Sequence, residues 1–274
     1  MIGFFENIPS YYRTALLVAG LMLLWIIEGV IPRFRFSNNN KYRHAGTNLF
    51  FTLTTAVVNL GFAFLIVKAS EWTSAEKFGV LYWLGLPLWA HLLGALLMMD
   101  FIGAYLVHVI QHKVAWMWHF HKVHHTDKEV DATTALRHHP GESIFRVVAL
   151  FLAIALMGVP VWMVMLYQTI SAFMSQFNHA NIKLPKWLDT ALSWIIVSPD
   201  MHKVHHSTWQ PQTDSNYANI FSIWDRLFGT FVKVKDTTSI RYGLDEYMDG
   251  RYQQIGPLLK APWKDEKKKQ RKHD

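Results

Sequence analysis

Long apolar runs separated by short polar segments fill the first hundred positions of the chain. They cover residues 12–31, 47–67 and 80–99, with Glu28 near the end of the first and Pro87 inside the third. About 20 apolar residues suffice to cross about 30 Å of hydrocarbon as a helix. The first run lacks a basic leading segment and a small-residue cleavage site, which favours an anchor over a signal peptide. The pattern therefore predicts three membrane-spanning helices.

A fourth apolar region occupies residues 144–177 and has Gly158-Val-Pro160 at its centre. Glycine and proline together favour a turn. The two halves have roughly 15–17 residues, which corresponds to roughly 22–26 Å of helix. We predict a helical hairpin over residues 144–178 that enters the membrane deeply or just crosses it. A hairpin within a soluble core is the alternative.

The positions of Lys and Arg predict the orientation of these helices. The loop at residues 33–43 is the basic one, so we expect it to be cytoplasmic and the N-terminus to lie outside. Three spans then place residues 100–142 on the cytoplasmic side. The hairpin returns the chain there, so residues 179–274 are expected to be cytoplasmic too. The sequence thus predicts an all-α integral membrane protein, a helical bundle with a cytoplasmic histidine-rich cap.

Eight of the 15 histidines fall in three short stretches, HVIQH at residues 108–112 and HKVHH at residues 121–125 and again at 202–206. On a helix, positions i, i+3 and i+4 share one face. Each HKVHH is therefore expected to present three imidazoles to one point, and HVIQH two more. Neutral imidazole is a good ligand for Fe, Zn, Cu and Ni. The candidate ligands are His108, His112, His121, His124, His125, His202, His205 and His206.

The residue types in the chain exclude several kinds of metal site. The chain has no Cys, which excludes disulfides, thiolate ligands and a Cys nucleophile. It also lacks an HExxH motif, and a haem needs only one or two axial ligands. Eight histidines therefore favour a site with two metal ions, with iron the best choice and zinc or manganese next.

The net charge of +7 is concentrated in the basic tail at residues 264–272. Such a tail is either a solvated, disordered segment or a segment attracted to an anionic membrane leaflet. The apolar runs make a membrane the expected partner and argue against nucleic acid.

These motifs resemble those of the fatty acid hydroxylase/sterol desaturase superfamily, whose members are integral-membrane di-iron enzymes. The three histidine stretches match the family's HxxxH, HxxHH and HxxHH in order, and the resemblance covers about residues 95–232. It implies a catalytic domain there, after N-terminal spans at 1–94 and before a C-terminal extension at 233–274. Residues around the histidines match the family as well. Asp100, Tyr105 and His108 match its D-x4-Y-x2-H lead-in, and residues 118–126 match its aromatic-x-F-H-K-x-H-H stretch. Residues 137–142 match its R-x-H-P-x-E segment, and residues 216–217 and 224–230 match its closing N-Y and W-D-x-x-F-G-T segments.

The resemblance also extends the set of candidate ligands. Family members bring about ten histidines to two metals, and His139 and His179 would complete that number here, with His138 an alternative to His139. The fatty-acid 2-hydroxylase branch has an HxxxH at His179, whereas this chain has Lys183, which argues against that branch. We expect the remaining histidines not to be ligands: His44, His91, His119 and His273.

Three carboxylates near the motifs are candidates for orienting imidazole N–H groups. Helix capping or loop hydrogen bonding is the alternative for each. The three are Asp100, Asp214 and Asp225.

The resemblance implies an O₂-dependent oxidoreductase that hydroxylates or desaturates a lipid, with two iron ions as cofactor and O₂ as co-substrate. The lipid would enter from the bilayer and could be an acyl chain, a sterol, a carotenoid, a glyceryl ether or an aminolipid. No flavin or nicotinamide fingerprint is found, so a separate electron donor of the cytochrome b5, ferredoxin or reductase type is expected on the cytoplasmic side. A zinc-dependent membrane hydrolase and a metal transporter or store are the alternatives.

Overall fold

The computed structural model describes residues 9–36 and 40–264. Within these ranges the chain forms helices and turns, and its only β-pairing consists of isolated bridges such as that between Pro32 and Ile182. The predicted all-α class is therefore confirmed. Most of the basic tail, residues 265–274 with His273, lies outside the described residues.

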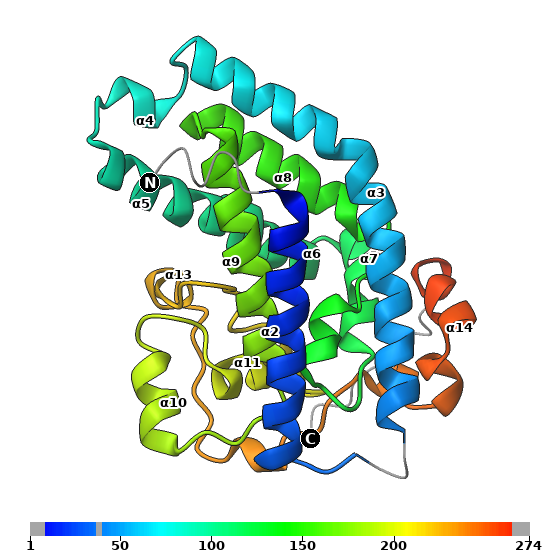
Figure 1. The fold of residues 1–274 in the computed structure, drawn as a ribbon. Coiled ribbons are helices and arrows are strands. Elements are labelled where there is room, and N and C mark those ends of the chain that lie inside the picture. Colours follow the sequence, from blue (N-terminus) through cyan, green and yellow to red (C-terminus); the bar gives the residue numbers. More distant parts are fainter. Residues whose placement is uncertain (1–8, 37–39, 265–274) are drawn as a thin grey trace.

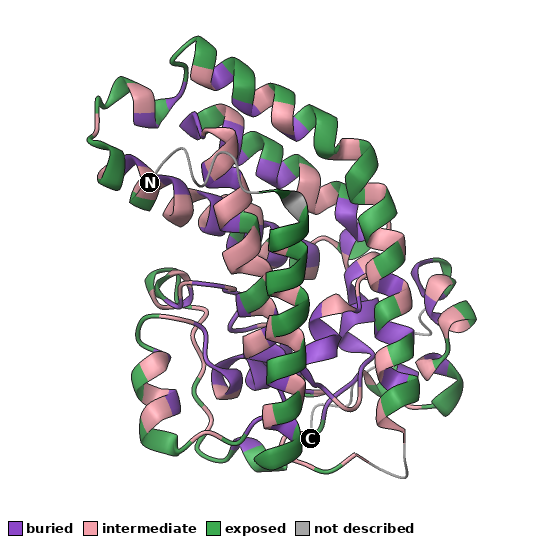
Figure 2. Cartoon of the chain, in the orientation of Figure 1, coloured by how far each residue is buried: buried purple, intermediate pink, exposed green. Residues whose placement is uncertain are grey.

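Three helices in the described ranges are long and apolar enough to cross a membrane. The first is α2 (Ser10–Val30) and the second is α3 (Lys41–Ala75). The third begins with α5 (Leu88–Asp100) and continues without a break through the π-helix η1 (Phe101–Leu106) into α6 (Val107–Lys113). The apolar windows of α2 and α3 are only 11% buried inside the protein, so their outer faces are free to contact lipid (Figures 1 and 2).

The structure corrects the bounds of the third predicted span. The run at 80–99 is split, because a short helix α4 (Val80–Trp83) ends at a turn with Gly85 at φ +58° and Pro87 caps α5. The continuous helix instead extends over 26 residues to Lys113. At 1.5 Å per residue it is about 39 Å long, which exceeds about 30 Å of hydrocarbon. Its last turns, with the first histidine pair, therefore reach beyond the apolar layer.

The predicted hairpin is present as two antiparallel helices, α8 (Glu142–Met157) and α9 (Val161–His179). Its turn packs against the far end of α3, where Ser70 Oγ donates to the carbonyl of Val159. On the other side, His91 Nε2 donates to the carbonyl of Gly158 over 3.1 Å. The hairpin therefore reaches the depth at which α3 ends, and it encloses a core of methionine, leucine, isoleucine and valine side chains.

The remaining helices form a cap at the other end of the bundle (Figure 1). Buried residues gather in the interior of this cap (Figure 2). Its elements are α7 (Ala115–His125), η2 (Ala132–Leu136), α10 (Lys186–Leu192), α11 (Pro199–His205), α12 (Gln210–Thr213), α13 (Ile223–Leu227), η3 (Thr237–Ser239), η4 (Asp245–Tyr247), η5 (Gly250–Gln253), α14 (Ile255–Leu259) and η6 (Ala261–Trp263).

The C-terminal segment packs against the back of α7. Tyr252 and Leu258 share a core with Val123 of α7 and Phe51 of α3. The described part of the predicted extension thus contributes to the packing of the cap.

Glu28 ties the first spanning helix to the cap. Its Oε1 accepts hydrogen bonds from the backbone N–H groups of Ala132 and Asn181, each over 2.8 Å. Its other oxygen lies 3.5 Å from the ammonium of Lys41. A buried carboxylate is tolerated when it is paired and hydrogen-bonded, so this residue fixes α2 against two cap segments.

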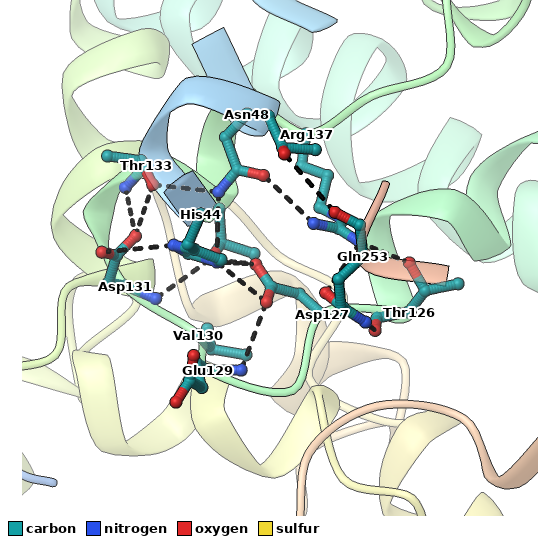
Figure 3. A network of polar contacts seen from close by, with 12 residues as sticks. His44, Asn48, Thr126, Asp127, Glu129, Val130, Asp131, Thr133, Arg137 and Gln253 are labelled. Carbon is teal, nitrogen blue, oxygen red and sulfur yellow. Dashed lines mark hydrogen bonds and ion pairs between the residues drawn. The ribbon is translucent and has the colours of Figure 1, made fainter. Parts of the chain in front are cut away.

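A buried polar network joins α3 to the loop that follows α7 (Figure 3). Asp127 accepts from His44 Nε2 over 2.8 Å and from Thr134 Oγ1 over 2.7 Å. Arg137 is fully buried and donates to Thr126, Asn48 and the side chain of Gln253. Leaving one of these charges unpaired would be strongly unfavourable, so the network holds the end of α7 in one position.

Candidate metal centre

Nine imidazoles converge in two groups inside the cap. In each group the candidate ligand nitrogens all lie within 4.8 Å of one another. Group 1 takes two residues from α6, two from α7 and one from α11. Group 2 takes one from α7, one from the end of α9, one from α11 and the residue that follows α11. Group 1 is His108, His112, His121, His125 and His205; group 2 is His124, His179, His202 and His206.

Each HKVHH stretch is shared between the two groups. In α7, His121 and His125 point into group 1, and His124 points into group 2. In α11 the assignment is reversed, because His202 and the following His206 face group 2 and His205 faces group 1. The expectation that each stretch presents three imidazoles to one point is therefore wrong. Positions i and i+4 share a group, and position i+3 turns toward the neighbouring one.

The spacing of the Nε2 atoms fits ligands around an ion. His121 Nε2 lies 3.0 Å from His108 Nε2 and 3.2 Å from His125 Nε2. His179 Nε2 lies 3.0 Å from the Nε2 atoms of His124, His202 and His206 alike. Two nitrogens that each lie about 2.1 Å from one ion at right angles are about 3.0 Å apart.

Acceptors on the outer side of the rings fix which nitrogen carries the proton. The Nδ1 atoms of His108, His179 and His205 each lie 2.7 Å from a backbone carbonyl, those of Tyr217, Ser175 and Ser215. A carbonyl oxygen only accepts, so Nδ1 carries the proton and Nε2 keeps its lone pair. These lone pairs point into the groups, where a metal would use them.

Several buried imidazole nitrogens have no protein hydrogen-bond partner among the described residues. In group 1 these are Nε2 of His112 and of His205. Buried polar atoms are nearly always satisfied, and an exception indicates a site for a water or an ion. The donor set, its nitrogen spacing and these unsatisfied atoms all fit a pair of metal ions.

Burial keeps the cluster imidazoles neutral. It lowers the pKa of His121 to about 3, although the neighbouring Glu142 acts in the opposite direction. Burial, reinforced by the neighbouring imidazoles, also holds the pKa values of His124, His125 and His205 well below the usual range. A neutral imidazole is the form that binds a metal.

Two carboxylates contact ring nitrogens of group 1. Asp214 Oδ1 lies 3.2 Å from His112 Nδ1, as the sequence suggested. Glu142 Oε1 lies 3.0 Å from His121 Nδ1, and its Oε2 lies 3.1 Å from His138 Nδ1. Glu142 was not among the carboxylates predicted from the sequence to orient imidazoles. Its signal was the family's R-x-H-P-x-E segment, in which the glutamate stands beside the histidines.

The other two candidate carboxylates hold backbone instead of imidazoles. Asp100 accepts from the N–H groups of Ile220 and Phe221 and from Trp224 Nε1. Asp225 accepts from the N–H groups of Tyr217 and Ala218 and from Thr230. For both residues the structure therefore confirms the alternative, a loop hydrogen bond, and not the orientation of an imidazole. Their effect on the site is indirect, since they position the segment that carries the Tyr217 carbonyl.

His179 joins group 2, whereas His139 is placed outside both groups. His139 Nδ1 accepts from the N–H of Gly141, and its Nε2 donates to the Leu259 carbonyl. The neighbouring His138 stacks on His124 with ring centroids 4.5 Å apart. Of the four histidines expected not to be ligands, the three that the structure describes also lie outside the groups: His44, His91 and His119.

The fold and the site together define an all-α protein with three helices long and apolar enough to cross a membrane and, in its cap, two all-histidine groups that could hold metal ions. The sequence profile described as fatty acid hydroxylase matches residues 92–230, which is half of the chain. The chain therefore belongs to the fatty acid hydroxylase family.

Curated relatives share modest identity with the chain. Alkylglycerol monooxygenase from Xenopus tropicalis is 34% identical over 52% of this chain and 30% of its own length. Ornithine lipid hydroxylase OlsE from Rhizobium tropici is 27% identical over 47% of this chain and 38% of its own. Alkylglycerol monooxygenase from Homo sapiens is 27% identical over 87% of this chain and 51% of its own length. The chain thus spans about half or less of these relatives. No solved structure is significantly similar to it.

Proposed function

We propose that this protein is an O₂-dependent di-iron oxidoreductase that hydroxylates a membrane lipid. The relatives of this chain are named as monooxygenases and hydroxylases. These names favour hydroxylation over desaturation. Ether lipids and amino-acid lipids, the substrates that the names of the relatives suggest, are the first to test.

The proposal rests on the two imidazole groups. Group 1 has five histidines and group 2 has four, and the ligand nitrogens of neighbouring rings lie about 3 Å apart. An all-nitrogen donor set leaves a redox-active metal free to change oxidation state, which suits O₂ chemistry. When bound, the two irons would supply the activation of O₂. The chain supplies neutral lone pairs, fixes the ring orientations through Nδ1 and buries the groups away from bulk water.

The position of the groups suits a substrate that stays in the bilayer. Group 1 receives two ligands from α6, the continuation of the third spanning helix, and group 2 receives His179 from the end of the hairpin. A lipid can therefore approach along these helices without crossing the aqueous phase. Two electrons per turnover must come from outside the chain, and we propose a separate donor protein on the cytoplasmic side.

The decisive experiment combines metal analysis with isotope labelling. Gently purified protein should contain close to two irons, and label from ¹⁸O₂ should enter the lipid product. His124→Ala should abolish turnover, whereas His119→Ala, a histidine outside both groups, should retain it. Product formation without O₂ would refute the proposal. Zinc as the sole metal of fully active protein would favour the hydrolase instead.

A further inference from the structure

Large apolar side chains are exposed on the cap, outside the three spanning helices. Trp194 and Ile195 follow α10, and their surfaces are 65% and 70% exposed. On α13 and just after it, Ile223, Leu227 and Phe228 are 50%, 66% and 52% exposed. Clustered exposed apolar residues on a protein mark a surface that contacts something else. We call these five residues the apolar lip.

The two segments of the apolar lip form one continuous surface. The N–H of Ser222 donates to the Ile195 carbonyl over 3.3 Å, and Ile196 pairs with Phe221 in an isolated bridge. The guanidinium of Arg226 lies 4.1 Å from the Trp194 ring centroid and thereby joins α13 to the segment after α10. The lip is therefore held as a unit.

The lip is also continuous with the third spanning helix. The ring of Phe101, the residue at which α5 passes into η1, stacks on Phe228 with centroids 5.3 Å apart and lies 4.9 Å from Trp224. The carboxylate of Asp100 accepts from Trp224 Nε1 over 3.0 Å. In Figure 1, α13 lies next to the end of α5 that faces the cap. The lip thus adjoins the third spanning helix at the junction of α5 and η1.

We propose that the apolar lip is embedded in the headgroup and acyl boundary of the leaflet that faces the cap. Tryptophan beside aliphatic residues is typical of this boundary. A cation belongs there as well, and Arg226 supplies it: its guanidinium donates to the Ser193 carbonyl and lies 3.9 Å from the Phe231 ring. Because the lip adjoins a lipid-facing helix, a bilayer is the partner that covers both at once.

The apolar lip is connected to the metal centre through hydrogen bonds. Asp225, between the exposed residues of α13, accepts from the N–H of Tyr217, and the carbonyl of Tyr217 accepts from His108 Nδ1. The lip and a group 1 imidazole are therefore two hydrogen bonds apart. The embedding itself follows from the exposed surface and does not depend on the proposed reaction.

Site-directed spin labelling can test the inference directly, because the chain has no Cys. Single cysteines replace Leu227 or Ile195 in the full chain, reconstituted in phosphatidylcholine–phosphatidylglycerol vesicles. Leu93→Cys, exposed on α5, serves as the lipid control, and Asp249→Cys, exposed on the cap, serves as the aqueous control. The measurements are the collision rates of each label with O₂ and with a nickel chelate, and the metal content of each variant.

Labels at positions 227 and 195 should collide more with O₂ than with the nickel chelate, as is also expected of the label at position 93. The ratio of the two collision rates should place positions 227 and 195 at a shallower depth in the membrane than position 93. The label at position 249 should show the opposite ratio. The proposal is overturned if positions 227 and 195 match position 249 in variants with full metal content. It is also overturned if both labels are shielded from both reagents and show a short label–label distance, because a second copy of the chain would then cover the lip.

Discussion

At the scale of single residues, the interleaving of the two HKVHH stretches makes the groups chemically separable. His124 has its Nε2 3.0 Å from that of His179 in group 2, whereas His121 has its Nε2 3.0 Å from that of His108 in group 1 and its Nδ1 3.0 Å from Glu142 Oε1. The two residues stand three positions apart on one helix, so their replacement perturbs the same element. Differences between the two variants therefore report on the groups and not on the helix.

His124→Ala should lower the metal content from about two ions per chain to about one, because it removes one of the four ligands of group 2. His121→Ala should remove the other ion. Elemental analysis of protein purified without chelators measures both. His139→Ala is the matched control and should keep both ions, since its ring lies outside the groups. Loss of both ions in His124→Ala or in His121→Ala, with both retained in the control, would show that the groups do not bind independently.

Glu142→Gln should weaken metal binding at group 1 by about 10–100-fold, because the amide no longer offers a charged acceptor to His121 Nδ1. Competition with a chelator of known affinity measures the change. Asp100→Asn is the comparison, since that carboxylate contacts backbone and an indole. It should lower the thermal unfolding midpoint with little change in metal affinity. An equal loss of metal affinity in both variants would contradict the assignment of Glu142.

The eight clustered histidines could be named as candidate ligands from the sequence, because they recur at helical spacing. Their division between two groups could not be predicted, since the packing of α6, α7 and α11 against one another decides which ring enters which group. His179 required the family resemblance. The choice between His138 and His139 could not be made, since both lie in the irregular segment between η2 and α8, where no periodicity fixes the side on which a ring points. Asp100 and Asp225 were ambiguous for a related reason: a carboxylate accepts equally well from imidazole and from backbone.

At the scale of elements, the turn of the hairpin depends on two glycines that pack face to face. A Cβ on Gly79, where φ is +119°, would lie 2.3 Å from the backbone nitrogen of Gly158. Gly158 itself has a φ of +75°. Neither position accepts a side chain without moving the other backbone.

Gly79→Ala should therefore lower the free energy of unfolding by about 2–5 kcal/mol, from overpacking and backbone strain together. Gly61→Ala, in the interior of α3 with open space around it, is the control and should be neutral or stabilising by up to about 1 kcal/mol. Thermal unfolding in detergent measures both. Equal stability of the two variants would show that the hairpin turn is not anchored at Gly79.

The start of α11 rests on a buried carboxylate. Asp189 accepts from Ser198 Oγ and from the N–H of Asp200. Burial, together with the nearby Asp200 carboxylate, raises the pKa of Asp189 to about 6. The folded state therefore binds this proton more tightly than the unfolded state. The contribution to stability falls as pH rises from about 4 to about 6 and is constant above that range.

Asp189→Asn should remove this pH dependence. Relative to the wild type, the variant should gain about 1–2 kcal/mol of stability between pH 4 and pH 7, because it carries no ionisable group. Denaturant unfolding of both proteins at pH 4 and at pH 7 measures this change in relative stability. The hydrogen bonds that the variant loses are lost at both pH values, so their cost cancels in the comparison. A difference of zero, or a relative loss at pH 7, would contradict the raised pKa.

Of the elements, the first two spans and the hairpin could be predicted from apolar length. The bounds of the third span could not, because the composition of residues 80–99 is uniformly apolar, and only the left-handed Gly85 and Pro87 divide it. A helix over residues 100–112 was expected, but the π-helical geometry of η1 was not, because six residues are too few to show a period.

At the scale of the whole molecule, the cap and the loop after α3 lie at opposite ends of the bundle (Figure 1). Arg33, at the start of the basic segment, pairs with Asp200 of α11 in the cap, and we therefore expect the cap to face the cytoplasm. A cysteine replacing Asp249 in the cap should react with an impermeant maleimide only after cell lysis. A cysteine replacing Glu76, exposed after α3, should react in intact cells. The reverse pattern would invert the proposed orientation.

The carboxylate of Glu28 has a consequence for how the chain is made. Its partners Ala132 and Asn181 follow it by 104 and 153 residues. At 5–20 residues per second the ribosome delivers Asn181 roughly 8–30 s after Glu28. Before Ala132 is made, Lys41 alone of these three partners can meet this charge in the nascent chain, and Asn181 is still missing when Ala132 arrives. An incompletely paired charge is unfavourable near the hydrocarbon layer. The helix α2 thus reaches its final hydrogen bonding only when the hairpin has been completed.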